Sequence, residues 1–156
     1  MLRELTTDDA VEVAALIRAA FADLPQPVDP APSALRETAE TIGAALAEGG
    51  GAGIEADGRL VGCVLWREEG GGLYLGRLAV AAGARGQGVA RRLVAAVEAQ
   101  ARRLGLGRVH LSTRLAMGAN RRLFAACGFV ATVQRAHPGY AVPTYVEMEK
   151  WLDKSG

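Results

Sequence analysis

The chain has 156 residues, 50% of them hydrophobic, which is enough to form one domain with a substantial core. Eighteen lysines and arginines against seventeen aspartates and glutamates give a net charge of +1, so charge gives no reason to expect nucleic acid or an anionic membrane as a partner. The apolar runs are too short for a membrane span, and the segment after Met1 lacks signal-peptide character; we therefore expect a cytoplasmic protein.

The first part of the chain predicts a short strand and two helices separated by a loop. The strand is expected at 2–5, and a helix with an N-cap at 6–9 follows because apolar residues then recur at helical spacing as far as Phe21. Four prolines within 24–32 predict a loop. Ser33 is expected to cap a second helix, which ends near the glycines at 49–51.

The middle of the chain predicts three antiparallel strands and an amphipathic helix. Runs at 54–56 and 60–66 flank the turn dipeptide Asp57-Gly58, which is typical of a tight hairpin, and a third strand is expected over 73–80. A helix then begins at Val89, and its apolar stripe is formed by Leu93, Val97 and Leu104.

The last part predicts a strand at 108–113, a short helix at 118–127 ended by Gly128, and strands at 129–134 and 144–152. We find no repeat, linker or low-complexity tract that would divide the chain. One domain over 1–154 is therefore expected.

The cysteines and histidines of the chain do not predict a metal site. Cys63 and Cys127 lie in apolar surroundings far apart in the sequence, which favours buried free thiols. His110 falls in an expected strand and His137 in an expected loop, and neither has a ligand partner at metal-binding spacing.

The stretch 85–90, Arg-Gly-Gln-Gly-Val-Ala, lies between a strand and the start of a helix. The first N–H groups of a helix lack intrahelical partners, and glycines let an anion approach them closely, so this turn is typical of a phosphate site. Arg85, Arg91 and Arg92 add positive charge. The alternative is an ordinary strand-to-helix turn with solvated arginines.

The spacing of the glycines narrows the classes of ligand that this stretch could bind. A dinucleotide fingerprint would need a small residue where Arg91 stands, and the chain lacks the Gly-Lys-Ser/Thr triplet of a nucleoside-triphosphate loop, so a nucleotide-binding α/β protein is disfavoured. The stretch instead resembles the acyl-CoA signature Arg/Gln-x-x-Gly-x-Gly/Ala of the GNAT superfamily of N-acetyltransferases. Arg85, Gly88 and Ala90 match its defined positions.

Two further features extend this resemblance over essentially the whole chain. The expected order of strands and helices is that of GNAT enzymes, with the signature after the fourth strand. The segment 123–129, Leu-Phe-Ala-Ala-Cys-Gly-Phe, is similar to their closing helix motif. The resemblance implies a single α/β (α+β) domain, in which a mixed, mostly antiparallel sheet of about seven strands is flanked by four helices.

The resemblance also implies the cofactor and its contacts. Acetyl-CoA is expected to lay its pantetheine arm along the main chain of Leu78, Ala79 and Val80. Its pyrophosphate is expected to meet the stretch formed by Arg85, Gly86, Gln87, Gly88, Val89 and Ala90. Further cofactor contacts are expected from Arg91, Asn120 and Phe124, although Asn120 is more simply interpreted as a helix cap, and Met117 stands where many relatives have asparagine.

The implied reaction is direct transfer of an acetyl group to an amine, which needs a base for the amine and a proton for the departing thiolate. Phe124 stands where the family usually has the tyrosine that acts as general acid. The proton would then come from water or from another tyrosine, Tyr74, Tyr140 or Tyr145, or the thiolate would leave unassisted. The carboxylates expected near the site are Glu55, Glu68 and Glu69.

The acceptor is expected to be an amine of a small molecule or a peptide, and the resemblance implies a homodimer that pairs through C-terminal strands. Because Phe124 replaces the usual acid and the base is unassigned, a noncatalytic acyl-CoA-binding or regulatory module on the same fold stays an alternative.

Overall fold

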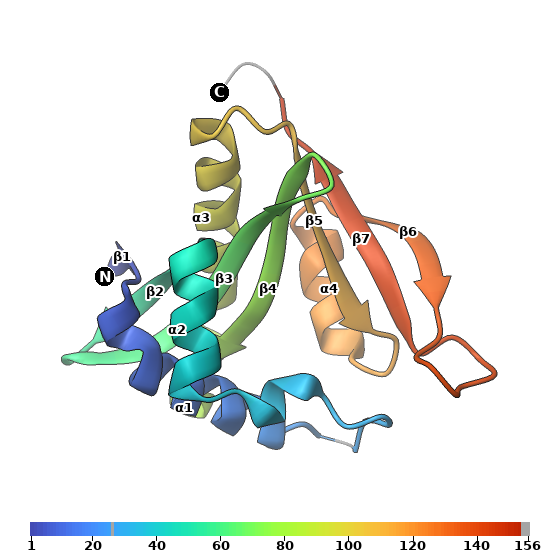
Figure 1. Cartoon of the computed structure of the whole chain (residues 1–156), viewed down its shortest axis with the longest axis horizontal. Coiled ribbons are helices and arrows are strands. Elements are labelled where there is room, and N and C mark those ends of the chain that lie inside the picture. Colours follow the sequence, from blue (N-terminus) through green and yellow to red (C-terminus); the bar gives the residue numbers. More distant parts are fainter. Residues whose placement is uncertain (26, 154–156) are drawn as a thin grey trace.

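The structure, a computed structural model, describes residues 1–25 and 27–153 (Figure 1). The expected domain end at 154 lies outside the described residues. The strands are β1 (Leu2–Glu4), β2 (Gly50–Ala56), β3 (Arg59–Glu69), β4 (Gly72–Val80), β5 (Arg108–Arg114), β6 (Val130–Arg135) and β7 (Tyr145–Trp151). The helices are α1 (Ala10–Ala22), α2 (Ala39–Glu48), α3 (Val89–Arg103) and α4 (Gly118–Ala126), with 3-10 turns η1 (Thr7–Asp9), η2 (Ser33–Arg36) and η3 (Ala82–Ala84).

The strands form one seven-stranded sheet in the order β1-β2-β3-β4-β5-β7-β6. Every neighbouring pair is antiparallel except β4 and β5, which are parallel. The expected fold class, a mostly antiparallel mixed sheet with four helices, is therefore confirmed.

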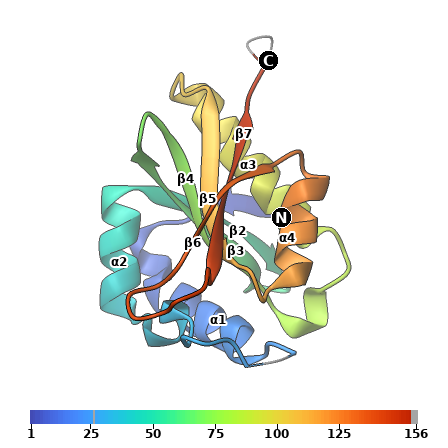
Figure 2. The same cartoon turned by 90° about the vertical axis from the view of Figure 1, so that its right-hand side faces the viewer.

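The helices cover both faces of the sheet, with α2 on one side and α3 and α4 on the other in the turned view (Figure 2). Alternating side chains of β3 supply the two cores, because successive residues of a strand point to opposite faces. Cys63 and Leu65 pack with α1 and α2, whereas Val64 and Trp66 belong to the cluster that includes α3. The described part of the chain holds no helix long and apolar enough to cross a membrane.

The second helix begins later than expected. Ser33 opens only the 3-10 turn η2, and α2 starts after Thr38. Thr38 and Thr41 cap this start reciprocally: the Thr38 hydroxyl accepts the Thr41 N–H at 3.2 Å, and the Thr41 hydroxyl accepts the Thr38 N–H at 2.9 Å. The Ser33 hydroxyl instead accepts a hydrogen bond from Arg77, so its predicted role as a helix cap was wrong.

The glycines expected to end this helix instead begin β2, four residues before the predicted strand. A Cβ at Gly50 would lie 2.6 Å from the indole nitrogen of Trp66, and one at Gly51 would lie 2.5 Å from the carbonyl oxygen of Val64. Glycine is needed here because the strand passes very close to β3. In the sequence, glycines placed for this reason look the same as glycines that end a helix.

The stripe of α3 also differs at its end. The helix stops at Arg103, and Leu104 is 45% exposed rather than packed on the sheet. Gly105 then adopts a φ of +72°, which turns the chain so that Leu106 packs against the core instead.

The pairing of β4 with β5 positions the site. The two strands pair only at Leu73 with Val109 and at Tyr74 with His110, and then diverge, as Figure 1 shows. Beyond this point β4 continues to pair with β3, but a bulge interrupts the ladder, and Arg77 within it has a φ of +52°. A gap is thus left along the edge of β4 that faces β5.

A close approach between β3 and α3 gives a test of this packing. A Cβ at Gly62 would lie 2.5 Å from Cγ1 of Val89, a short and stiff side chain. Gly62→Ala should therefore lower the free energy of unfolding by about 1–3 kcal/mol, measured by urea denaturation. Gly107→Ala, where the added Cβ meets open space, is the matched control and should change it by less than about 0.5 kcal/mol. Equal stability of the two variants would contradict the close packing.

Candidate active site

A cavity of about 550 Å³ opens where β4 and β5 separate. Its walls come from both strands, the connection between α1 and α2, the start of α4 and the loop between β6 and β7. Leu78 of β4 and Asn120 and Phe124 of α4 contribute one part of the wall, while Tyr145 and His137 contribute another. The cavity thus joins residues from the two halves of the sheet.

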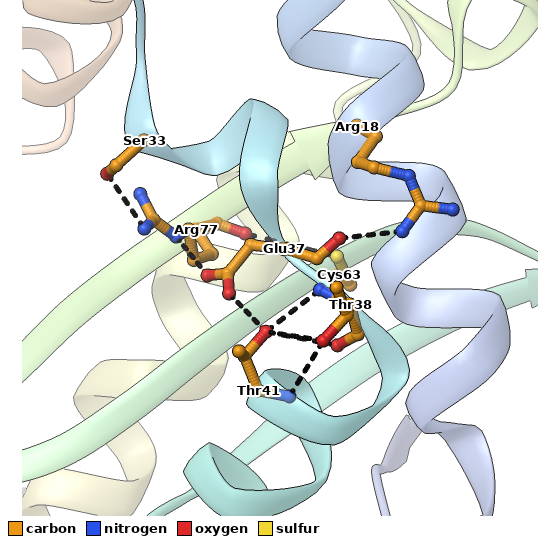
Figure 3. A network of polar contacts seen from close by, with 7 residues as sticks. All are labelled: Arg18, Ser33, Glu37, Thr38, Thr41, Cys63 and Arg77. Atoms are coloured by element: carbon orange, nitrogen blue, oxygen red, sulfur yellow. Dashed lines mark hydrogen bonds and ion pairs between the residues drawn. The ribbon is translucent and has the colours of Figure 1, made fainter.

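Arg77, in the bulge of β4, is held by a network of polar contacts (Figure 3). Its Nε donates to Oε2 of Glu37 at 2.6 Å and its Nη2 to the Ser33 hydroxyl at 3.0 Å. The other carboxylate oxygen of Glu37 accepts the Thr41 hydroxyl at 2.6 Å, and the Glu37 carbonyl accepts from Arg18 at 2.7 Å. The network fixes both the bulge and the segment that leads into α2.

The connection between α1 and α2 is fastened to the other half of the sheet as well. Arg114 of β5 donates to the carbonyl oxygens of Pro30 and Ala31 at 2.6 and 3.3 Å. The Tyr140 hydroxyl donates to Asp29 at 2.6 Å, and this hydrogen bond raises the pKa of Tyr140 above its usual value. Burial lowers the pKa of Arg114. This connection therefore spans the mouth of the gap.

A smaller cavity of about 300 Å³ lies at the start of α3. Gly86 and Gly88 line it with φ angles of +78° and +80°, and Gly88 is the N-cap of the helix. Because glycine has no side chain, the first N–H groups of this 15-residue helix are not capped by the N-cap residue. Arg85 and Arg91 also line the cavity, so positive charge and the positive end of the helix dipole coincide.

The two cavities follow one another along the edge of β4, because Leu78 lines the larger one and Val80 the smaller one. The Ala81 N–H donates to Val61 of β3 at 2.8 Å, and N–H groups alternate in direction along a strand. The N–H group of Val80 therefore points away from β3, into the gap, and Leu78 lies in the bulge just before it. An elongated molecule with an anionic end fits this arrangement.

Comparison with protein-family models decides the family. The model of the Acetyltransferase (GNAT) family matches residues 14–129, which is most of the chain. The chain belongs to the GNAT family of acetyltransferases. This membership confirms the expectation of an acetyltransferase that uses acetyl-CoA, as enzymes of this family do.

Solved structures confirm the fold. The ribosomal-protein-S18-alanine N-acetyltransferase of Escherichia coli matches with a TM-score of 0.75 and 17% identity over 100% of this chain and 96% of that chain. A GNAT-family acetyltransferase of Streptococcus pneumoniae matches with a TM-score of 0.73 and 18% identity over 98% and 99% of the two chains. The yncA protein of Salmonella typhimurium, solved with its cofactor acetyl-CoA, gives a TM-score of 0.75 and 17% identity over 100% and 95%. Comparison with curated protein sequences gives no match.

Most of the residues expected to contact the cofactor lie together around the two cavities. Leu78, Asn120 and Phe124 line the larger cavity, and the smaller one is lined by Val80, Arg85, Gly86, Gly88, Val89, Ala90 and Arg91. Two residues lie differently. The Gln87 side chain donates to the Gly83 carbonyl at 3.4 Å, and Ala79 is buried against the α1 and α2 side of the core.

Arg85 is already paired in this GNAT chain. Its Nη1 lies 2.9 Å from Oδ2 of Asp23, at the beginning of the connection between α1 and α2. Both side chains are largely exposed, so the ion pair contributes little and leaves the guanidinium able to exchange partners.

The structure corrects the simpler interpretation of Asn120. Met117 is the N-cap of α4, and Asn120 is the third residue of the helix, whose start has no side-chain capping hydrogen bond. Asn120 lines the larger cavity instead. Phe124 is 4% exposed and packs edge-on against Phe129, with ring centroids 5.8 Å apart. Apolar packing therefore surrounds the position at which relatives have tyrosine.

None of the carboxylates expected near the reaction lines either cavity. Glu55 of β2 pairs with Arg3 at 2.6 Å near the β1 edge of the sheet. Glu68 and Glu69 are exposed at the end of β3, and Glu69 pairs with Arg67 at 3.0 Å. Of the three tyrosines expected as proton donors, Tyr74 and Tyr145 line the larger cavity, whereas Tyr140 is held by Asp29.

Several residues of the cavity were not anticipated from the sequence. Glu37, Arg77 and Arg114 carry no local signal, because a bulge and a loop bring them together only in the folded chain. His137 was interpreted as an ordinary loop residue, yet it lines the cavity. Among the described residues no group of histidines, cysteines and carboxylates could hold a metal ion.

The free thiols follow the expectation in part. Cys63 is buried, and this burial raises the pKa of its thiol to about 12. Cys127 is only partly buried, and burial raises its pKa as well. Neither thiol is therefore activated as a nucleophile.

The network around Arg77 can be tested through stability. Glu37→Ala leaves a partly buried guanidinium without its carboxylate partner, which should lower the free energy of unfolding by about 1–3 kcal/mol in urea denaturation. Glu40→Ala, at an exposed position in the first turn of α2, should change it by less than about 0.5 kcal/mol. A Glu37 variant as stable as the Glu40 variant would show that the network contributes nothing.

Proposed function

We propose that this chain transfers the acetyl group of acetyl-CoA directly to an amine of a small molecule or a peptide that binds in the larger cavity. The observation that carries the proposal is the succession of two cavities along the unpaired edge of β4. The anionic end of the donor and its thioester can then be held at the same time, while an acceptor approaches from the side of the α1–α2 connection.

The smaller cavity fits the pyrophosphate of acetyl-CoA. Open space lies where a Cβ would stand at Gly86 and Gly88, so phosphate oxygens can approach the main chain closely. Arg91 and Arg85 supply charge-assisted hydrogen bonds, Arg85 by exchanging Asp23 for phosphate.

The edge of β4 fits the pantetheine arm. The Val80 N–H faces the gap and the bulge at Leu78 interrupts the ladder to β3, so the amide groups of the arm can pair with this edge as an added strand would. Bound acetyl-CoA supplies an activated acetyl group as a thioester. The Leu78 N–H is the donor that we assign to the thioester oxygen, which becomes more negative during transfer.

The thiolate leaves without help from Phe124, because a phenyl ring carries no acidic proton. A thiol with a pKa near 8.5 is a fair leaving group, so this is chemically tolerable. Tyr74 and Tyr145 are the tyrosines that line the cavity, and we propose that one of them or water completes the protonation.

We also propose three properties that were expected from the sequence analysis. These are an amine of a small molecule or a peptide as the acceptor, a cytoplasmic location and a homodimer. β6 lies at the edge of the sheet with all six residues exposed, which leaves an edge accessible for pairing with a second copy.

The test is release of free CoA from acetyl-CoA across a panel of amines. The panel contains alkylamines, phenethylamine, amino acids, peptides with a free N-terminus and hydroxylamine. We expect at least one amine to raise thiol release well above the rate without amine, with the acetylated product identified by mass spectrometry. If acetyl-CoA binds but no amine is acetylated, the noncatalytic acyl-CoA-binding alternative replaces this proposal.

The donor site has its own test at Gly88. Gly88→Val adds a branched side chain at a φ of +80° in the smaller cavity and should weaken acetyl-CoA binding at least tenfold, or by about 1.4 kcal/mol, in calorimetric titration. Gly58→Val is the matched control, because Gly58 also has open space around it and a φ of +77° but lies in the β2–β3 hairpin. Both variants should lose similar stability, and only the first should lose affinity. If a folded Gly88 variant binds acetyl-CoA with unchanged affinity, the phosphates do not bind in this cavity.

A further inference from the structure

The larger cavity has few groups able to take a proton from an amine. Glu37, Glu48 and His137 are the carboxylates and imidazole that line it. Both carboxylate oxygens of Glu37 are engaged, one by Arg77 and the other by Thr41. Glu48 is exposed at the end of α2, where water solvates it. The choice therefore narrows to His137.

The ring of His137 is oriented by its neighbours. Its Nδ1 hydrogen-bonds the hydroxyl oxygen of Thr144, which also accepts the backbone N–H of His137 at 3.0 Å. A threonine oxygen has two lone pairs, so it can accept both N–H groups and hold the proton on Nδ1. The ring also packs edge-on against Tyr145, with centroids 4.9 Å apart. Within the described residues, nothing hydrogen-bonds Nε2.

We propose that His137 is the general base of the acetyl transfer, taking the proton of the acceptor ammonium on Nε2 either directly or through one water. This inference rests on the proposed function and adds the residue that activates the amine. It also assigns a role to the β6–β7 loop, which carries His137 over the cavity formed by β4 and β5.

The charges around His137 favour this role. Burial and the Arg114 guanidinium of β5 lower its pKa below the ordinary value, so the imidazole is unprotonated at neutral pH and able to accept a proton. The other groups near it are the phenols of Tyr145 from β7 and Tyr140 from its own loop, and Asp29 of the α1–α2 connection already accepts from Tyr140. Arg114 is therefore the charged group that acts on the ring.

The protons balance as follows. The acceptor arrives as an ammonium ion and gives one proton to Nε2 of His137, which later passes it to solvent. The neutral nitrogen forms a bond to the acetyl carbon, the bond between that carbon and sulfur breaks, and its electron pair stays on sulfur. A second proton from the nitrogen ends on the thiolate, which gives an N-acetyl amide and CoA.

The experiment compares two acceptors in His137→Gln. Phenethylamine, or the panel alkylamine with the highest kcat/KM, is an ammonium ion near pH 7 and needs a base, whereas hydroxylamine is already largely neutral. We expect kcat/KM for the ammonium acceptor to fall about 10²–10⁴-fold, with a loss below about tenfold for hydroxylamine and an unchanged Kd for acetyl-CoA. His110→Gln, the only other histidine and one outside both cavities, is the control; because its ring packs against Tyr74, activity itself can change, but the ratio of kcat/KM for the two acceptors should not.

The pH profile gives a second readout. In the unaltered protein kcat/KM should rise with pH through an apparent pKa below 6.5 and then level off, and this step should vanish in His137→Gln. Thr144→Val removes the hydroxyl that holds Nδ1 and should give a smaller loss of kcat/KM, again larger for the ammonium acceptor than for hydroxylamine. This variant replaces His137→Gln in the test if that variant does not fold. Equal losses for both acceptors, or no loss, would overturn the assignment. If no amine of the panel is acetylated by the unaltered protein, the proposed function fails instead.

Discussion

The early separation of β4 from β5 is the constraint on which the site depends. The two strands share only two residue pairs, while β4 stays paired with β3 and β5 pairs along its whole length with β7. The sheet is thus two halves joined at one end. Backbone groups along the open edge of β4 need hydrogen-bond partners, and a gap between strands gives a ligand with amide groups a place to supply them.

The gap is supported by interactions from both sides. A residue such as Arg77 at a positive φ costs about 1–3 kcal/mol and persists where the surroundings determine it. Here Glu37 and Ser33 hold its guanidinium, and Arg114 holds the same α1–α2 connection from β5. One connection therefore bridges both halves, and its position depends on each of them.

The donor end of the site could be predicted from the sequence, but the acceptor end could not. The phosphate site proposed at 85–90 follows from two glycines beside a helix start, with Arg85 within the stretch and Arg91 directly after it. Leu78 and Val80 were placed by family resemblance. In contrast, Glu37, Arg77, Arg114 and His137 come from four separate segments, and no local pattern relates them. The predicted capping role of Ser33 was wrong for a similar reason, because the hydrogen-bond partner of its side chain is Arg77, 44 residues away.

The replacement of tyrosine by Phe124 changes where polar chemistry can occur. With an apolar, buried ring at this position of α4, the groups that we propose for proton transfer lie elsewhere in the cavity wall, on β4, on β7 and on the β6–β7 loop. That loop is held by the bond from Tyr140 to Asp29, so its geometry depends on the α1–α2 connection. A ligand phosphate that draws Arg85 from Asp23 acts on the beginning of the same connection. Because this exposed ion pair contributes little, its exchange for a phosphate would leave the connection held by Arg77 and Arg114.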